Sequence, residues 1–171
     1  GYAAPEEYNN EEALTLPEGS QIVRNGFTFA GWYASPSFSG SPITSIPAGR
    51  TEPQTLYAKW NPITYQVKMN LNGGTLQRPS DNVTSYVAGT EVTLPTPTHR
   101  YRIFAGWYSN EECEGSPVTS INPLDYGNKE YWAKWDAVTY GVTLHLQGGE
   151  LAEGLSDTFD YEAGIGSSLP T

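Results

Sequence analysis

The sequence has little that would support disulfide cross-links, long helices or membrane insertion. It contains one cysteine, Cys113, so no disulfide can form within the chain. It has no run of about 18 apolar residues, and we therefore expect no direct membrane insertion. No window shows helical periodicity, so we expect little helix. No secretory signal peptide is visible at Gly1, which is typical of a mature protein, of an excised fragment or of a cytoplasmic protein.

Positive charge is also scarce. Nine Lys and Arg residues are scattered among 19 Asp and Glu residues, which gives a formal net charge of −10 and a pI near 4.5. A chain with this charge repels polyanions such as nucleic acids, and it also repels a bare anionic membrane surface. Nucleic-acid binding is therefore not expected.

Aromatic residues, glycine and proline are abundant instead. The chain has 5 Trp, 12 Tyr and 5 Phe, and each buried aromatic removes roughly 150–250 Å² from water. A few aromatics can therefore build the core of a small module. The 18 Gly and 13 Pro favour many short strands joined by turns.

The main feature of the sequence is an internal repeat with a period of 75 residues. Phe-Ala-Gly-Trp-Tyr at 29–33 recurs at 104–108, and Ala-Lys-Trp at 58–60 recurs at 133–135. Comparing residues 29–60 with their counterparts gives 14 identities in 32 positions without a gap. Fixed self-similarity of this kind indicates tandem modules.

The other half of the module repeats with the same period. Residues 61–96 match 136–171 with 13 identities in 36 positions. We therefore divide the chain into a partial first repeat at 1–60 that lacks its opening strand, a complete repeat at 61–135, and the opening half of a third repeat at 136–171. This phase predicts a longer parent protein with more copies.

The local patterns predict short strands. Residues 64–71 alternate between apolar and polar side chains, as do 139–146, which is typical of half-buried strands. Asn72-Gly73-Gly74 is a hairpin signal. Residues 116–122 fit either one helical turn or a loop. Further strands are expected at 56–60, 91–94, 103–108 and 130–135.

Together these motifs resemble the Listeria–Bacteroides repeat family, which includes the B repeat of internalin B. The resemblance is carried by Phe-x-Gly-Trp-Tyr at 104–108, a Gly-x-x-Val-Thr segment at 115–119, Ala-Lys-Trp at 133–135 and Tyr-x-Val-x-x-x-Leu-x-Gly-Gly at 65–74. It implies small, β-grasp-like, ubiquitin-related modules in an elongated tandem array. It also implies a place in secreted or wall-anchored bacterial proteins, and no catalytic residues.

The recurring aromatic motif has two readings, a sugar-stacking platform or a packed core, and we favour the core. Strict alternation along residues 104–108 places Phe104 and Tyr108 on one side and Trp107 on the other. Trp132 and Tyr57 lie on the strand face opposite to that of Trp135 and Trp60. They are therefore the better candidates for exposed ligand contacts. The structural motif comprises Phe29, Gly31, Trp32, Tyr33, Trp60, Phe104, Gly106, Trp107, Tyr108 and Trp135.

No catalytic, cofactor or metal site is expected. The loop acids Glu111, Glu112 and Glu114 do not recur, because their counterparts are Pro36, Ser37 and Ser39. Together with Glu6, Glu7, Glu11 and Glu12 they suit a solvated surface. His99, His145 and Cys113 do not stand at metal-ligand spacing. Cys113 lies in a variable loop without a partner base for nucleophilic chemistry.

Three function classes follow. The first is a spacer or stalk at the cell surface, with weak contacts to host or matrix protein or glycan. The second is a carbohydrate- or protein-binding adhesin that uses Trp132 and Tyr57. The third, least favoured, is a hydrolase that uses Glu111 or Glu114. The incomplete terminal repeats also predict head-to-tail self-association, because unpaired strand edges attract partners.

Overall fold

The computed structural model describes residues 11–165, so Glu6 and Glu7 lie outside the described residues. Within this range the chain is almost entirely strand and turn, which confirms the mainly β prediction; its one helical element is a 3₁₀ turn, η1. The elements are β1 (Leu14–Thr15), β2 (Phe27–Tyr33), β3 (Ser45–Ile46), β4 (Tyr57–Pro62), β5 (Thr64–Asn70), η1 (Pro79–Asp81), β6 (Ser85–Val87), β7 (Val92–Thr93), β8 (Arg102–Tyr108), β9 (Ser120–Ile121), β10 (Lys129–Ala137), β11 (Thr139–Thr143) and β12 (Thr158–Glu162).

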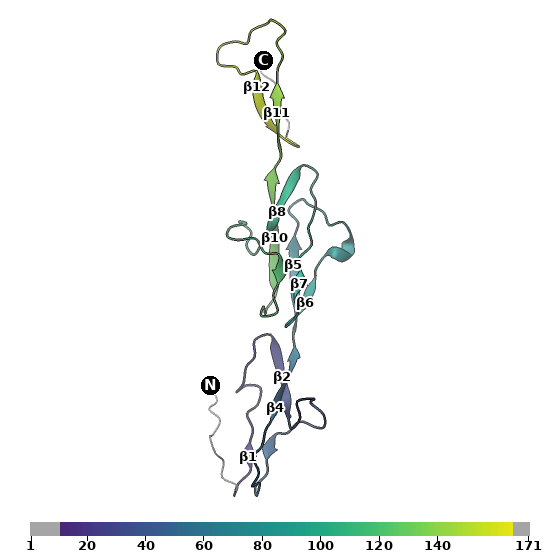
Figure 1. Ribbon diagram of the computed structural model, residues 1–171, viewed down its shortest axis with the longest axis vertical. Coiled ribbons are helices and arrows are strands. Elements are labelled where there is room, and N and C mark those ends of the chain that lie inside the picture. Colours follow the sequence, from purple (N-terminus) through teal and green to yellow (C-terminus); the bar gives the residue numbers. More distant parts are fainter. Residues whose placement is uncertain (1–10, 166–171) are drawn as a thin grey trace. The chain divides into compact units, whose positions relative to one another are not determined.

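The chain forms two compact units. Unit 1 contains residues 1–66, 85–91 and 122–128, and unit 2 contains the remaining residues. In unit 1, β2 and β4 form an antiparallel pair, and β1 pairs with β3 (Figure 1). The first residues of β5 pair with β6, so this unit combines the first repeat with one end of the complete repeat.

Unit 2 holds the rest of the complete repeat and the third repeat. Strand β10 pairs antiparallel with β8 and parallel with the second part of β5, so it lies between them (Figure 1). The short strands β7 and β9 form a separate antiparallel pair. Strands β11 and β12 form an antiparallel hairpin.

Most of the expected strands form, with two corrections. The strands expected at 56–60, 64–71, 91–94, 103–108 and 130–135 appear with slightly different ends. The hairpin expectation at Asn72-Gly73-Gly74 is wrong: a turn forms there, but β5 pairs with β6, which begins only at Ser85. Residues 116–122 hold neither a helical turn nor a plain loop, because β9 pairs there with β7.

A β-bulge corrects the predicted face of Trp107. Along β8 the β10 partner of Gly106 is Lys134 and that of Phe104 is Trp135, so Ala105 is the extra residue. The bulge brings Phe104 and Trp107 to the same side, with their rings 5.6 Å apart. Simple alternation was therefore wrong, since a bulge shifts the face of every residue beyond it.

The same bulge occurs at the equivalent position of β2. There two adjacent residues of β4 pair with Gly31 and with Phe29, so the residue between these two is the extra one. The rings of Phe29 and Trp32 also lie 5.6 Å apart. Gly31 and Gly106 have φ of 120° and 132°. A Cβ on either glycine would lie within 2.7 Å of the Cβ of the facing proline, Pro42 or Pro117. Both the backbone conformation and the close approach therefore require glycine.

The aromatic residues form the core, as the sequence favours. Trp107 is only 2% exposed, and Phe104 contacts both Trp107 and Trp135 edge to face. The Trp107 indole donates a hydrogen bond of 2.7 Å to Pro95 O, and the Trp135 indole donates one of 2.9 Å to Leu71 O. Each indole thereby ties a loop carbonyl to the strand that carries the tryptophan.

Replacing Gly106 with alanine tests the bulge. We expect Gly106→Ala to lower the free energy of unfolding by about 2–4 kcal/mol, because strain at positive φ adds to overlap with Pro117. Gly115→Ala is the matched control, since Gly115 also has positive φ but open space around it, and should cost about 1–2 kcal/mol. Urea unfolding measures both, and equal losses would contradict the role of the close approach.

Candidate functional site

The most distinctive site in unit 1 is the place where one repeat passes into the next. Only Ile63 separates β4 from β5. The Ile63 amide donates a hydrogen bond of 2.9 Å to Gly26 O, and Ile63 O accepts one of 3.0 Å from the Ala88 amide. One residue thus connects the turn of the first repeat to the β6 end of the complete repeat. We call residues 24–27, 63, 86–89 and 123–127 the first joint.

Small residues allow close packing at the first joint. Gly26 has φ of 82°, and a Cβ there would lie 2.9 Å from the Ala88 Cβ. Gly89 lies against the Cζ end of the Phe27 ring, and the Arg24 guanidinium lies over the same ring at 3.8 Å from its centroid. A hollow of about 410 Å³ remains beside these groups, lined also by Leu124 and Tyr126.

Unit 2 contains the same arrangement one period later. Only Val138 separates β10 from β11, and the Ala163 amide donates a hydrogen bond of 2.8 Å to Val138 O. Gly164 also lies against an aromatic ring, but that ring belongs to Tyr101, whose counterpart is Gly26 rather than Phe27. We call residues 100–102, 138, 140 and 161–164 the second joint. Sequence analysis missed both joints, although the recurrence of Ala-Gly at 88–89 and 163–164 was a visible signal.

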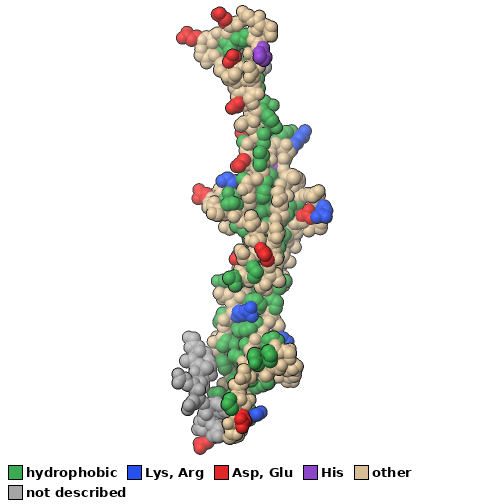
Figure 2. Space-filling view, viewed as in Figure 1, with side chains coloured by type: hydrophobic (Ala, Val, Ile, Leu, Met, Phe, Trp, Pro, Cys, Tyr) green, Lys and Arg blue, Asp and Glu red, His purple; other side chains and the backbone are tan. Residues whose placement is uncertain are grey.

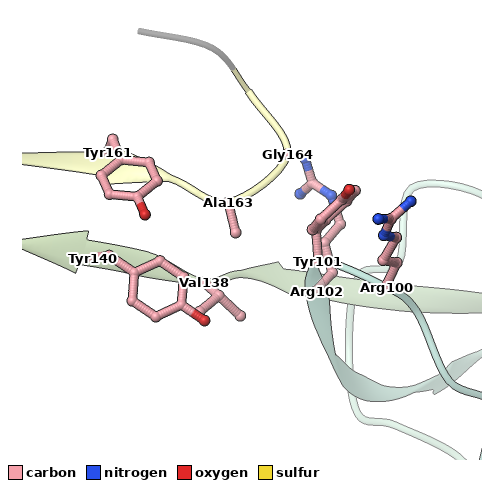
Figure 3. Close-up of a pocket in the computed structure, with 8 residues that line it drawn as sticks. All are labelled: Arg100, Tyr101, Arg102, Val138, Tyr140, Tyr161, Ala163 and Gly164. Carbon is pink, nitrogen blue, oxygen red and sulfur yellow. The ribbon is translucent and has the colours of Figure 1, made fainter. Parts of the chain in front are cut away.

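The second joint has a more polar lining. Arg102 forms an ion pair of 2.8 Å with Glu162, at positions that hold Phe27 and Val87 in the first joint. The Arg100 guanidinium lies 4.9 Å from the Tyr101 ring centroid. Figure 3 shows Arg100, Tyr101 and Arg102 beside a hollow of about 590 Å³, with Tyr140 and Tyr161 on the two paired strands.

One tyrosine differs sharply between the joints. Tyr86 is 2% exposed and its hydroxyl donates a hydrogen bond of 2.7 Å to Gly127 O, whereas Tyr161 is 38% exposed. Burial, helped by the nearby Asp125 and Tyr65, raises the pKa of Tyr86 above its ordinary value. In the complete repeat, the segment around Gly127 therefore covers the pair formed by Tyr65 and Tyr86. The corresponding pair at the second joint, Tyr140 and Tyr161, is exposed.

The two candidate ligand contacts occupy equivalent strand positions. Tyr57 lies opposite Tyr33 on β2 and is 37% exposed, and Trp132 lies opposite Tyr108 on β8 and is half-buried. The neighbouring tyrosines carry lysine ammonium groups over their rings, Lys59 at 5.4 Å and Lys134 at 5.2 Å. Ligand contact by Tyr57 and Trp132 stays a prediction.

The remaining candidate residues do not gather into a site. Over residues 11–165 no group of three or more His, Cys, Asp or Glu side chains is placed to hold a metal ion. Glu111, Glu112 and Glu114 are exposed in one loop, and the Cys113 thiol donates a hydrogen bond to Glu111 O. Figure 2 shows acidic and basic side chains dispersed over the visible face. No helix in this part of the chain is long and apolar enough to cross a membrane.

Comparison with known proteins gives one family and two relatives. The model of the Listeria-Bacteroides repeat domain matches residues 1–59 and 65–134, in two copies. A protein of Evansella cellulosilytica named "Putative Gly-rich membrane protein" is 32% identical over 93% of this chain, and the match covers 18% of that protein. A second, named "Putative membrane protein", is 30% identical over 95% of this chain and 23% of its own length.

The chain therefore spans about a fifth of the length of these relatives. No solved structure matches it.

The first joint can be tested with two glycine variants. We expect Gly26→Val to speed hydrogen exchange at the Ile63 and Ala88 amides, because the new side chain overlaps Ala88. Gly49→Val is the control, since Gly49 has a similar φ of 79° and open space around it. Unchanged exchange at both amides in Gly26→Val would show that close packing at Gly26 does not hold the joint.

Proposed function

The chain belongs to the Listeria-Bacteroides repeat domain family, and we propose that it is a non-catalytic repeat region of a bacterial cell-surface or secreted protein. In this role the modules act as a spacer that holds another part of the protein away from its anchor. The names of both relatives describe membrane proteins, which supports a place at the cell envelope. The net charge of −10 suits a soluble, well-hydrated surface.

The recurrence of the joint is the observation that carries this proposal. At each joint a single residue connects two successive repeats, and its carbonyl accepts a backbone hydrogen bond. A glycine packs against an aromatic ring at both joints. A flexible tether would need a longer polar or glycine-rich linker. A repeated short joint favours modules that keep a constant angle, and a constant angle is what an extended spacer requires.

The proposal includes a β-grasp-like module. The strand order β6-β5-β10-β8 has a parallel pair at its centre and antiparallel strands at both edges. This order agrees with a β-grasp sheet, while the connection from β6 to β8, which would hold the β-grasp helix, here contains only the short strand β7. We therefore infer a β-grasp variant in which aromatic packing replaces the helix.

Distance measurement between spin labels tests the spacer. Labels at the native Cys113 and at Ser37→Cys lie in adjacent repeats, in loops at corresponding places of the module. We expect double electron–electron resonance to give a narrow distribution of the distance between the two labels, because a tightly packed joint restricts rotation between modules. Adding Gly26→Val should broaden it, and adding Gly49→Val should leave it unchanged.

A broad distribution with the joint intact would contradict a stiff spacer. Equal broadening by both valine substitutions would point to general loss of folding rather than to the joint.

A second candidate function is an adhesin that binds glycan or protein. The exposure of Tyr57 and its equivalence to the half-buried Trp132 favour it, because an aromatic face repeated every 75 residues allows multivalent stacking. Each single site would be weak, and avidity would come from several copies that engage the same polymer.

The adhesin is tested on arrays of host and microbial glycans and matrix proteins, with the protein presented multivalently. A true site should lose at least about tenfold in apparent affinity when Tyr57→Ala and Trp132→Ala are combined. Tyr126→Ala is the matched control, since Tyr126 is an exposed tyrosine of the first joint and belongs to neither β4 nor β10. A blank array, or an equal loss with the control, would argue against these two residues as the site.

A further inference from the structure

The outer face of the sheet in unit 2 carries a polar cluster that neither the core nor the joints use. Side chains alternate between the two faces of a strand. The buried ones of β5, β8 and β10 lie on the inner face: Val67, Trp107, Tyr131 and Ala133. On the opposite face, β5 and β10 bring two pairs of neighbours together, Lys68 with Glu130 and Asn70 with Trp132. We call these four residues the outer-face cluster; all of them belong to the complete repeat.

The Glu130 carboxylate is held in one orientation through one of its oxygens. Its Oε1 lies 2.6 Å from the Lys68 ammonium and accepts a hydrogen bond of 2.9 Å from the Asn70 side-chain amide. These contacts, the one from Lys68 foremost, hold the pKa of Glu130 below its ordinary value. The carboxylate is therefore ionised near neutral pH. Within residues 11–165 its Oε2 receives no hydrogen bond, so this oxygen is a fixed acceptor that faces solvent.

Trp132 differs from the tryptophans of the core. Trp107 and Trp135 donate their indole N–H to loop carbonyls. In the part of the chain that the structure describes, no group accepts the Trp132 indole N–H, and no buried side-chain nitrogen lacks a partner. The Trp132 N–H is therefore accessible, and the half-buried ring keeps part of its surface uncovered.

We propose that the outer-face cluster binds a neutral pyranose ring of a glycan. The apolar face of the sugar packs on the Trp132 ring, and one sugar hydroxyl donates to Glu130 Oε2. Another hydroxyl accepts from the indole N–H or from Lys68. An aromatic surface beside a few fixed polar groups is the usual composition of a small-ligand site. This inference rests on the adhesin candidate above and adds the chemical class of its ligand and the polar contacts.

Charge favours a neutral sugar over an acidic or a cationic one. The net charge of −10 repels carboxylated and sulfated glycans. Glu130 already has Lys68 as its counter-ion, so the cluster offers no uncompensated negative charge to a ligand ammonium group. Sugar hydroxyls both donate and accept hydrogen bonds, which suits the Glu130 acceptor and the Trp132 donor together.

The first repeat offers a weaker version of the same face. The counterparts of Trp132 and Glu130 are Tyr57 and Thr55. Tyr57 supplies a smaller ring, and the Thr55 hydroxyl is uncharged. Hydrogen bonds to a carboxylate are roughly twice as strong as those between neutral groups. We therefore expect the complete repeat to carry most of the binding, so that Trp132→Ala loses more affinity than Tyr57→Ala.

Binding of the 171-residue protein to paired oligosaccharides tests the inference, with the protein presented multivalently. The probes are oligosaccharides of glucose, galactose, mannose and N-acetylglucosamine, together with glucuronic and galacturonic acid counterparts. We expect binding to a neutral probe, with at least about tenfold weaker binding to the acidic counterpart. The affinity for the neutral probe should stay nearly constant as salt is raised, because no net ligand charge is screened.

Glu130→Gln is the most specific variant. It keeps the shape of the side chain but replaces the charged acceptor, and it should weaken binding to the neutral probe at least about tenfold. Glu91→Gln is the matched control, because Glu91 is an exposed acid that belongs to neither β5 nor β10. It should bind like the unaltered protein. Trp132→Phe keeps an aromatic ring without the N–H, so its loss should lie between those of the unaltered protein and Trp132→Ala.

The outcomes separate this inference from the adhesin candidate. Binding to an acidic glycan or a protein that is lost in Trp132→Ala would leave the adhesin standing and overturn the neutral-sugar site. Equal losses in Glu130→Gln and Glu91→Gln would also overturn it. A blank with every probe would contradict both and leave the spacer, which the spin labels test. Trp132 lies beside the buried Tyr108, so circular dichroism checks folding; the surface change Glu130→Gln remains informative even if Trp132→Ala unfolds.

Discussion

The hydrogen bond from a tryptophan indole to a loop carbonyl is the interaction on which the module depends. Residues 11–165 form no α-helix that could cover the sheet, so side chains must hold the loops against the strands. Trp32 and Trp107 donate to Pro17 O and Pro95 O, and Trp135 donates to Leu71 O. Each bond satisfies the one polar atom of a large apolar ring, so the ring can be buried without a desolvation penalty.

Glycine allows these rings to reach their places. The bulge at Gly106 turns Trp107 to the side of Phe104, and Gly74 leaves room for Trp135. Packing and backbone conformation are therefore coupled: a larger residue at either glycine moves a tryptophan and releases the loop that it holds. The joints follow the same rule, since Gly89 and Gly164 lie against aromatic rings of the preceding repeat.

Much of this architecture can be predicted from the sequence, because the 75-residue period and the two-residue alternation are local patterns. Strand positions and an aromatic core follow from them directly. The face of Trp107 does not, because a bulge is decided by the tertiary contact between Gly106 and Pro117 rather than by alternation. The pairing of β5 with β6 across a long connection also escapes prediction, since the Asn72-Gly73-Gly74 turn looks the same with or without a returning strand.

The joints were missed for a related reason. A single Ala88-Gly89 pair is unremarkable, and its meaning depends on Gly26 and Phe27, which lie about 60 residues earlier in the chain. The same comparison of copies also separates two kinds of position. The strand motifs, the bulge glycines and the Ala-Gly pair of each joint recur, while loop residues 34–39 and 109–114 share no identity. Recurring positions are constrained by packing within and between repeats. Recognition that differs from copy to copy would use segments such as these loops, or residues 47–56 and 122–131, which also share no identity, whereas recognition common to both copies would use equivalent aromatic strand positions such as Tyr57 and Trp132.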